Sequence, residues 1–194
     1  MNRSFSFRRM LIATGAALAA ACGVASADIH VYTTSLNGAN ENPSNGSPGT
    51  GFVRVTYDDA LHTLRVESNF TGLIHPTTAA HIHGLATPPA NVGVAIPGGP
   101  SFADFPLGVT SGGSDDTLDL TLASSYRAAF ITNFGGGTVA GAEAALIGGL
   151  ETGRTYFNIH TSGFPAGEIR GWIPEPSSAL LLTAGIALAL RRRG

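Results

Sequence analysis

Short stretches of alternating hydrophobic and polar residues run through the middle of this chain and predict β-strands. Successive side chains of a strand point to opposite faces, so such alternation indicates a strand with one face in a core. The best hairpin is predicted for residues 51–57 and 61–70, which are joined by the acidic turn Asp58-Asp59. Further strands are predicted at 30–36, 79–84, 116–122, 154–161 and 168–172. In the strand 116–122, we expect Leu118, Leu120 and Leu122 to face the core.

Segments rich in Gly, Pro, Asn and Ser separate these strands and predict turns and loops. The Ala- and Leu-rich segment 139–150 predicts a helical turn or a short helix. Many short strands with turn signals between them favour an all-β fold. We therefore expect residues 28–172 to form a single antiparallel β-sandwich or barrel with a short helix, flanked by an N-terminal signal helix and a C-terminal hydrophobic helix.

Residues 1–27 have the three-part pattern of a cleavable secretory signal. An apolar stretch from Met10 to about Val24 is followed by Ala25-Ser26-Ala27, the small residues that signal peptidase needs, and it is preceded by Arg3, Arg8 and Arg9. A buried N-terminal helix would not require this order of segments. We therefore expect signal peptidase to cleave between Ala27 and Asp28.

The only cysteine of the chain, Cys22, lies inside this signal. A lipoprotein signal would make Cys22 the lipidated first residue, but the large aliphatic residue expected three positions earlier is Ala19 here. Cleavage after Ala27 leaves a mature chain with no thiol, no disulfide and no cysteine metal ligand.

Residues 173–194 form a second export-related pattern. Pro174-Glu175-Pro176 precedes an apolar run from Ser177 to Leu190, and the chain ends with Arg191, Arg192, Arg193 and Gly194. The run is shorter than the roughly 17–25 residues that usually span a bilayer, and it has no polar face for an amphipathic surface helix. By the positive-inside rule, the arginines would stay on the cytoplasmic side.

This arrangement resembles the PEP-CTERM sorting signal of Gram-negative bacteria. The resemblance implies that an exosortase recognises the tail and removes it near Pro174-Glu175-Pro176. It also implies a transient anchor in the inner membrane, followed by release to the cell surface or the extracellular space.

The region between the two ends is acidic. Residues 28–172 contain five arginines and no lysine against twelve acidic residues, a net charge of −7 with histidine neutral. Such a surface repels phosphate backbones, so we expect no binding to nucleic acid.

Four separated motifs in this region resemble the CHRD domain, which was first recognised in chordin. They are residues 36–43 at the start of the domain, His81-Ile82-His83-Gly84, the segment 153–161 that follows Ala144-Leu146, and 165–171. The resemblance covers essentially the whole mature domain. It implies a β-rich extracellular module that occurs in animal chordins and in exported bacterial proteins, with no activity generally assigned to the bacterial members.

Three histidines are candidate metal ligands. His81 and His83 are two positions apart on a predicted strand, so their side chains leave the same face. His160 lies on the polar face of the predicted strand 154–161. If the two strands pair, three imidazoles converge, a ligand set that suits Cu or Zn with one open position. His-x-His also occurs in copper-zinc superoxide dismutase, but the bridging and disulfide elements of that enzyme are missing here.

A second interpretation needs no metal. Imidazoles beside backbone carbonyls also satisfy buried polar groups, and Glu168 and Arg170 are placed for an ordinary cross-strand ion pair. His30, His62 and His75 have no partner pattern and are predicted as surface or turn residues. Gly135-Gly136-Gly137 lacks the context of a phosphate loop and is predicted as a flexible turn.

The sequence favours a non-enzymatic module of the cell envelope or extracellular matrix, with no catalytic residue. Besides signal peptidase and exosortase, exopolysaccharide and envelope proteins are the partners to expect. One alternative is a His-based Cu/Zn protein with redox chemistry. Another is an exopolysaccharide hydrolase that uses paired carboxylates such as Asp115, Asp116, Asp119 or Glu168. It has little support, because Asp115, Asp116 and Asp119 lie in and just after a Ser/Gly turn, where acids are usually solvated.

Overall fold

A computed structural model describes residues 28–173 of the 194-residue chain. The predicted signal segment 1–27 lies outside the described residues, and so does the predicted sorting tail 173–194 except for Ile173. Among the residues described, no helix has the length and apolar character needed to cross a bilayer.

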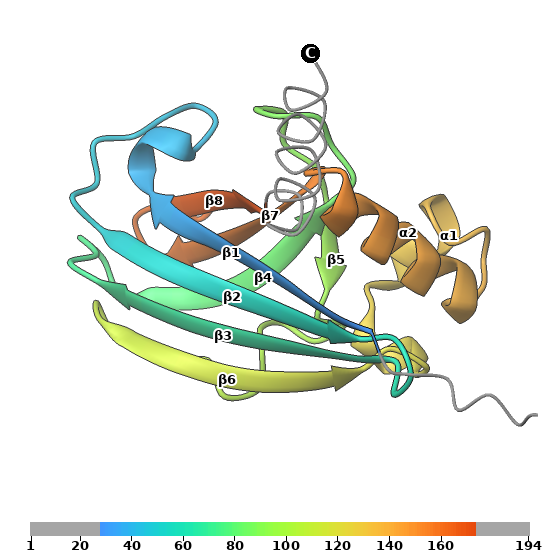
Figure 1. The fold of residues 1–194 in the computed structure, drawn as a ribbon. Coiled ribbons are helices and arrows are strands. Elements are labelled where there is room, and N and C mark those ends of the chain that lie inside the picture. The colour runs from blue at the N-terminus through green and yellow to red at the C-terminus, as the bar shows by residue number, and fades with distance from the viewer. Residues whose placement is uncertain (1–27, 174–194) are drawn as a thin grey trace, which may run out of the picture.

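The eight strands found in residues 28–173 belong to one antiparallel sheet that curls into a half-barrel, with the order β5-β4-β7-β8-β1-β2-β3-β6 (Figure 1). The predicted all-β fold is thereby confirmed, in its barrel-like form. The strands are β1 (Ile29–Asn37), β2 (Thr50–Asp58), β3 (Thr63–Thr71), β4 (Thr77–Gly84), β5 (Val94–Ile96), β6 (Gly112–Asp119), β7 (Thr155–Thr161) and β8 (Ile169–Ile173). The helices are α1 (Ala128–Asn133) and α2 (Val139–Glu151), with two 3-10 turns at Gly38–Asn40 and Ala123–Ser125.

The sheet consists of two four-stranded halves. Strands β1, β2, β3 and β6 run side by side as long strands, and β5, β4, β7 and β8 form the other half (Figure 1). The halves join between β1 and β8, where the register contains the single pair Asn37↔Arg170. Both helices cover one end of the half-barrel (Figure 1).

The core fills the concave side of the sheet. Its side chains come from alternate positions of both halves and are almost completely buried, among them Val53, Val55, Leu64, Val66, Ile82, Phe157 and Ile159. Ala142, Leu146 and Leu150 of α2 close the core at the helical end. This inward set fixes the register, because a slip by one residue would turn it outward.

The hairpin β2–β3, the strand β7 and the predicted helix at 139–150 are confirmed by the structure. The strand predicted at 116–122 is corrected, because β6 begins at Gly112 and ends at Asp119. Leu120 is buried as expected and Leu118 packs against the core, but Leu122 is 50% exposed. The chain turns into the 3-10 segment after Leu122, so the alternation no longer decides its direction.

Candidate functional site

The three candidate histidines meet on the convex side of the sheet. Strand β4 pairs with β7 so that Ala79 faces His160 and His81 faces Asn158. His81, His83 and His160 therefore stand on the same side of two adjacent strands, opposite to the core residues Ile82 and Ile159. The pairing on which the metal hypothesis depended is confirmed.

The imidazoles lie close together. Their ring centroids are 5.1 Å apart for His81 and His160, 5.6 Å for His83 and His160, and 5.7 Å for His81 and His83. One nitrogen from each ring lies within 4.8 Å of one nitrogen from each of the others. Ligands on a shared ion at about 2.0–2.1 Å would be roughly 3.4 Å apart, so the most distant nitrogens would have to approach each other by about 1.4 Å for coordination.

Each ring is held by a backbone carbonyl from a different loop. The nitrogens His81 Nε2, His83 Nδ1 and His160 Nδ1 lie 2.7, 2.8 and 3.0 Å from the carbonyl oxygens of Pro100, Val92 and Pro165. A carbonyl only accepts, so each of these nitrogens carries the proton and donates it.

The second nitrogen of each ring must then present a lone pair. His81 Nδ1, His83 Nε2 and His160 Nε2 are buried and have no hydrogen-bond partner among residues 28–173. A carbonyl that fixes the tautomer on one side and a free lone pair on the other is the usual state of a metal-ligating histidine.

Burial keeps the imidazoles neutral. Desolvation lowers the pKa of His81 to about 4 and that of His83 to about 3, and it also lowers the pKa of His160. The nearby positive charges of Arg127 and Arg170 act in the same direction. All three rings are therefore in the metal-binding form at neutral pH.

A buried ion pair continues the polar layer beside the histidines. Arg170 of β8 is cross-strand partner of Asn158, and its Nη2 donates to Glu41 Oε2 at 2.8 Å. Its guanidinium lies 4.1 Å from the centroid of the Tyr156 ring, which stacks on His83 with centroids 4.8 Å apart. Glu41 comes from the loop after β1, and desolvation raises its pKa to about 7 against the opposing influence of Arg170.

The expected ion pair between Glu168 and Arg170 is wrong. Glu168 instead accepts hydrogen bonds from Ser47 Oγ, Thr161 Oγ1 and the backbone N–H of Ile74. Glu168 therefore links three segments of the chain by hydrogen bonds. They lie next to the loop in which the carbonyl of Pro165 accepts from His160. Glu41 was missed as the true partner of Arg170 because it lies in a loop 129 positions earlier, with no periodic pattern to place it.

The acids proposed for a hydrolase do not form a pair. Asp115 is exposed and accepts from Arg65, Asp119 accepts from Thr121, and Asp116 accepts from the N–H of Asp104. Asp116 is only 5% exposed, which corrects its expected solvation and follows from its position on the inward face of β6. Glu168 is held at a different place by the contacts described above.

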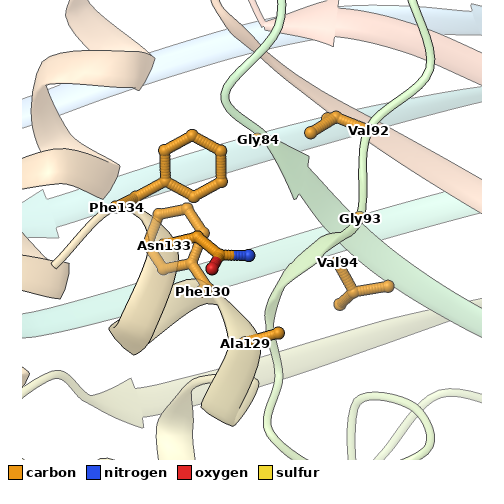
Figure 2. A pocket seen from close by; sticks show the side chains of 8 residues that line it. All are labelled: Gly84, Val92, Gly93, Val94, Ala129, Phe130, Asn133 and Phe134. Carbon is orange, nitrogen blue, oxygen red and sulfur yellow. The ribbon is translucent and has the colours of Figure 1, made fainter. Parts of the chain in front are cut away.

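A small pocket of about 160 Å³ lies next to the histidine layer, between α1 and the segment from Gly84 to Val94 (Figure 2). Phe130 and Asn133 of α1, and Phe134 directly after it, point into this space in Figure 2. Val92, whose carbonyl anchors His83, belongs to its wall. The pocket is largely apolar and offers no ligand group of the kind found in the triad.

The remaining histidines lie apart from the triad. His62, in the β2–β3 turn with φ 53°, contacts Glu143 Oε1 through Nδ1 at 2.7 Å, and this contact raises its pKa. His30 lies beside Tyr57 and His75 beside Phe164. The glycines 135–137 form the turn between α1 and α2, as predicted.

Comparison with known protein families gives one match. The family model described as the CHRD domain matches residues 32–173, which include every strand from β2 to β8 and all three histidines. No curated protein and no solved structure matches the chain.

Proposed function

The chain belongs to the CHRD-domain family, and on that premise we propose that it is an exported, non-enzymatic module that binds one copper or zinc ion through His81, His83 and His160. We place its role in the cell envelope or the extracellular matrix, where exopolysaccharide or envelope proteins would be its partners.

The observation that carries the metal site is the set of three unpartnered ring nitrogens. If the histidines only satisfied backbone carbonyls, one nitrogen of each ring would be explained and the other would remain desolvated without a partner. Each such buried group costs about 1–3 kcal/mol. A cation shared by all three nitrogens removes this cost, and imidazole is a preferred ligand of both copper and zinc.

The surroundings of the triad favour binding over turnover. His81 and His83 are 7% and 8% exposed, because the loops that supply the anchoring carbonyls also cover the rings. A substrate would have to displace these loops to reach the ion. We therefore propose that the ion stabilises the loops and does not act on a substrate.

The proposed export rests on the two chain ends. The Arg-apolar-small pattern of residues 1–27 supports cleavage between Ala27 and Asp28. The Pro174-Glu175-Pro176 motif, the apolar run and Arg191 to Arg193 support sorting by an exosortase at the inner membrane.

Elemental analysis tests the metal site. Protein purified without chelator, or loaded by titration, should contain one Cu or Zn per chain. His83→Ala removes a ligand, so its metal affinity should fall by at least the roughly 10–100-fold typical of losing a supporting residue. His75→Ala is the matched control, because His75 lies outside the triad, and it should bind normally. Absence of bound metal after titration would refute the site.

Mass spectrometry of the extracellular protein tests the export proposal. The recovered chain should begin at Asp28 and lack Arg191 to Gly194. Recovery of the arginine cluster on released protein would contradict removal of the tail.

A further inference from the structure

From the composition of this triad, and therefore resting on the proposed metal site, we infer that the site selects monovalent copper, Cu⁺, over divalent zinc, Zn²⁺. The ligand cluster contains three neutral imidazoles and, within residues 28–173, no carboxylate. The charge of the bound ion is thus not neutralised by its ligands.

Burial makes this lack of compensation costly for a divalent ion. Two of the three ligands are less than a tenth exposed. The cost of moving an ion from water into a protein interior rises with the square of its charge, so for ions of similar size it is about four times greater for a divalent than for a monovalent cation. A neutral, covered ligand set therefore penalises Zn²⁺ more than Cu⁺.

The nearest buried charged residues do not neutralise the charge of a bound ion. The Glu41 carboxylate already accepts from Arg170 at 2.8 Å and from Asn158 Nδ2 at 3.4 Å. Arg170 and His160 are diagonal neighbours on β8 and β7, since Arg170 pairs with Asn158. The ion pair thus adds no net negative charge beside the triad, and it contributes a guanidinium on the same side of the sheet.

The number of ligands points in the same direction. Zn²⁺ held by three histidines takes a water or another group as its fourth ligand, and the described part of the chain offers only three nitrogens in this cluster. Its walls are the Tyr156 ring, stacked on His83, and carbonyls that already accept the imidazole N–H groups. Cu⁺ is stable with three nitrogen ligands and needs no fourth group from the protein.

Competition titrations test the selection. The purified protein is titrated anaerobically with Cu⁺ against bicinchoninate, and separately with Zn²⁺ against a chromophoric chelator. We expect Cu⁺ to bind at least about 100-fold more tightly than Zn²⁺, given the charge penalty on the divalent ion. Equal affinities, or tighter binding of Zn²⁺, would overturn the selection while leaving the metal site intact. Failure to bind either ion would instead refute the proposed site itself.

A substitution at Ala79 tests the physical cause. Ala79 is partly exposed, faces His160 across the β4–β7 pair and lies two positions before His81 on the same side of the strand. Ala79→Asp adds a carboxylate ligand and should raise the affinity for Zn²⁺ about tenfold or more relative to Cu⁺. Ala79→Asn has nearly the same size without the charge and should leave the ratio of affinities close to that of the wild type. An unchanged ratio in Ala79→Asp would contradict the charge argument.

Discussion

The convex side of this sheet has two regions with the same alternation of residues and opposite environments. On β2, β3 and β6, the residues Arg54, Glu67 and Asp115 form a row across the strands and remain largely in contact with solvent. On β4, β7 and β8, the corresponding row consists of His81, Asn158 and Arg170, which are only 7%, 0% and 1% exposed. Loops cover the second row and leave the first open.

The comparison teaches that strand alternation assigns a side chain to a face but does not decide its energetics. Exposed ion pairs contribute about 0–1 kcal/mol, because water screens both charges. Removing one partner of a buried pair costs about 3–5 kcal/mol, because the other charge stays desolvated. We therefore expect substitutions in the row that the loops cover to cost more stability than equivalent substitutions in the open row.

The largest effect is expected for Arg170→Met, which leaves Glu41 buried without its partner. We expect the free energy of unfolding to fall by about 3–5 kcal/mol, as measured by urea denaturation. The double variant Glu41→Gln/Arg170→Met should recover part of this loss. If the single variant lost less than 1 kcal/mol, the buried row would be energetically equivalent to the exposed one.

Acidification should also lower the stability of the folded protein, because it acts on the histidines in and beside the buried row. The pKa values of His81 and His83 are about 4 and 3 in the folded protein, against an ordinary value of 6.5, so below pH 6.5 the unfolded chain takes up protons that the folded protein does not. Each ring then costs roughly 1.4 kcal/mol per pH unit. Glu41 acts oppositely, because its folded pKa of about 7 lies above its ordinary value.

When the opposing effect of Glu41 is subtracted from that of His81 and His83, the free energy of unfolding should fall by roughly 2 kcal/mol between pH 6.5 and pH 5. Urea midpoints measured in metal-free buffer across this window check the prediction. His83→Asn should remove most of the slope, and a slope that did not change in this variant would assign the acid sensitivity to other groups.

Gly167→Ala should disturb the same layer to a smaller extent than Arg170→Met does. Gly167 has φ 133°, and an added Cβ would lie 2.6 Å from Glu41 Oε1 and also in contact with the Asn158 side chain. We expect a loss of about 2–3 kcal/mol from the backbone conformation and the close contact together. Gly108→Ala is the control, because Gly108 has φ 77° with open space around it, and it should lose only about 1 kcal/mol. Equal losses would show that the contact with the buried layer does not matter.

The smallest effect is expected on the exposed row. Arg65 contacts Asp115 with its Nε at 2.7 Å, but both side chains are about half exposed. Arg65→Met, the same substitution as at position 170, should change the free energy of unfolding by about 1 kcal/mol or less, and 0.5 M salt should reduce the difference further. A loss as large as that of Arg170→Met would remove the contrast between the two faces.

The strands and the histidine triad could be predicted because both depend on local spacing. His81 and His83 share a face through their separation of two, and the polar face of 154–161 carries His160. The carbonyls of Val92, Pro100 and Pro165 could not be predicted, since they lie in loops and any residue type supplies a carbonyl. Glu41 was missed for a related reason, because nothing periodic in a loop indicates what the loop covers. The burial of Asp116, in contrast, follows from the alternation that places it on the same face of β6 as Leu118.

The strand pairing that assembles the triad has a consequence for the order of events in the life of the protein. Each carbonyl lies within 19 positions of the ring that it anchors, but His160 follows His83 by 77 positions and joins it only when β7 pairs with β4. The site is thus absent from the unfolded chain, and a metal that binds to it is acquired by folding. If the chain is exported unfolded, as proposed, it cannot carry an ion along, and the supply of metal at the place of folding, in addition to the ligands themselves, would determine which ion the proposed site takes up.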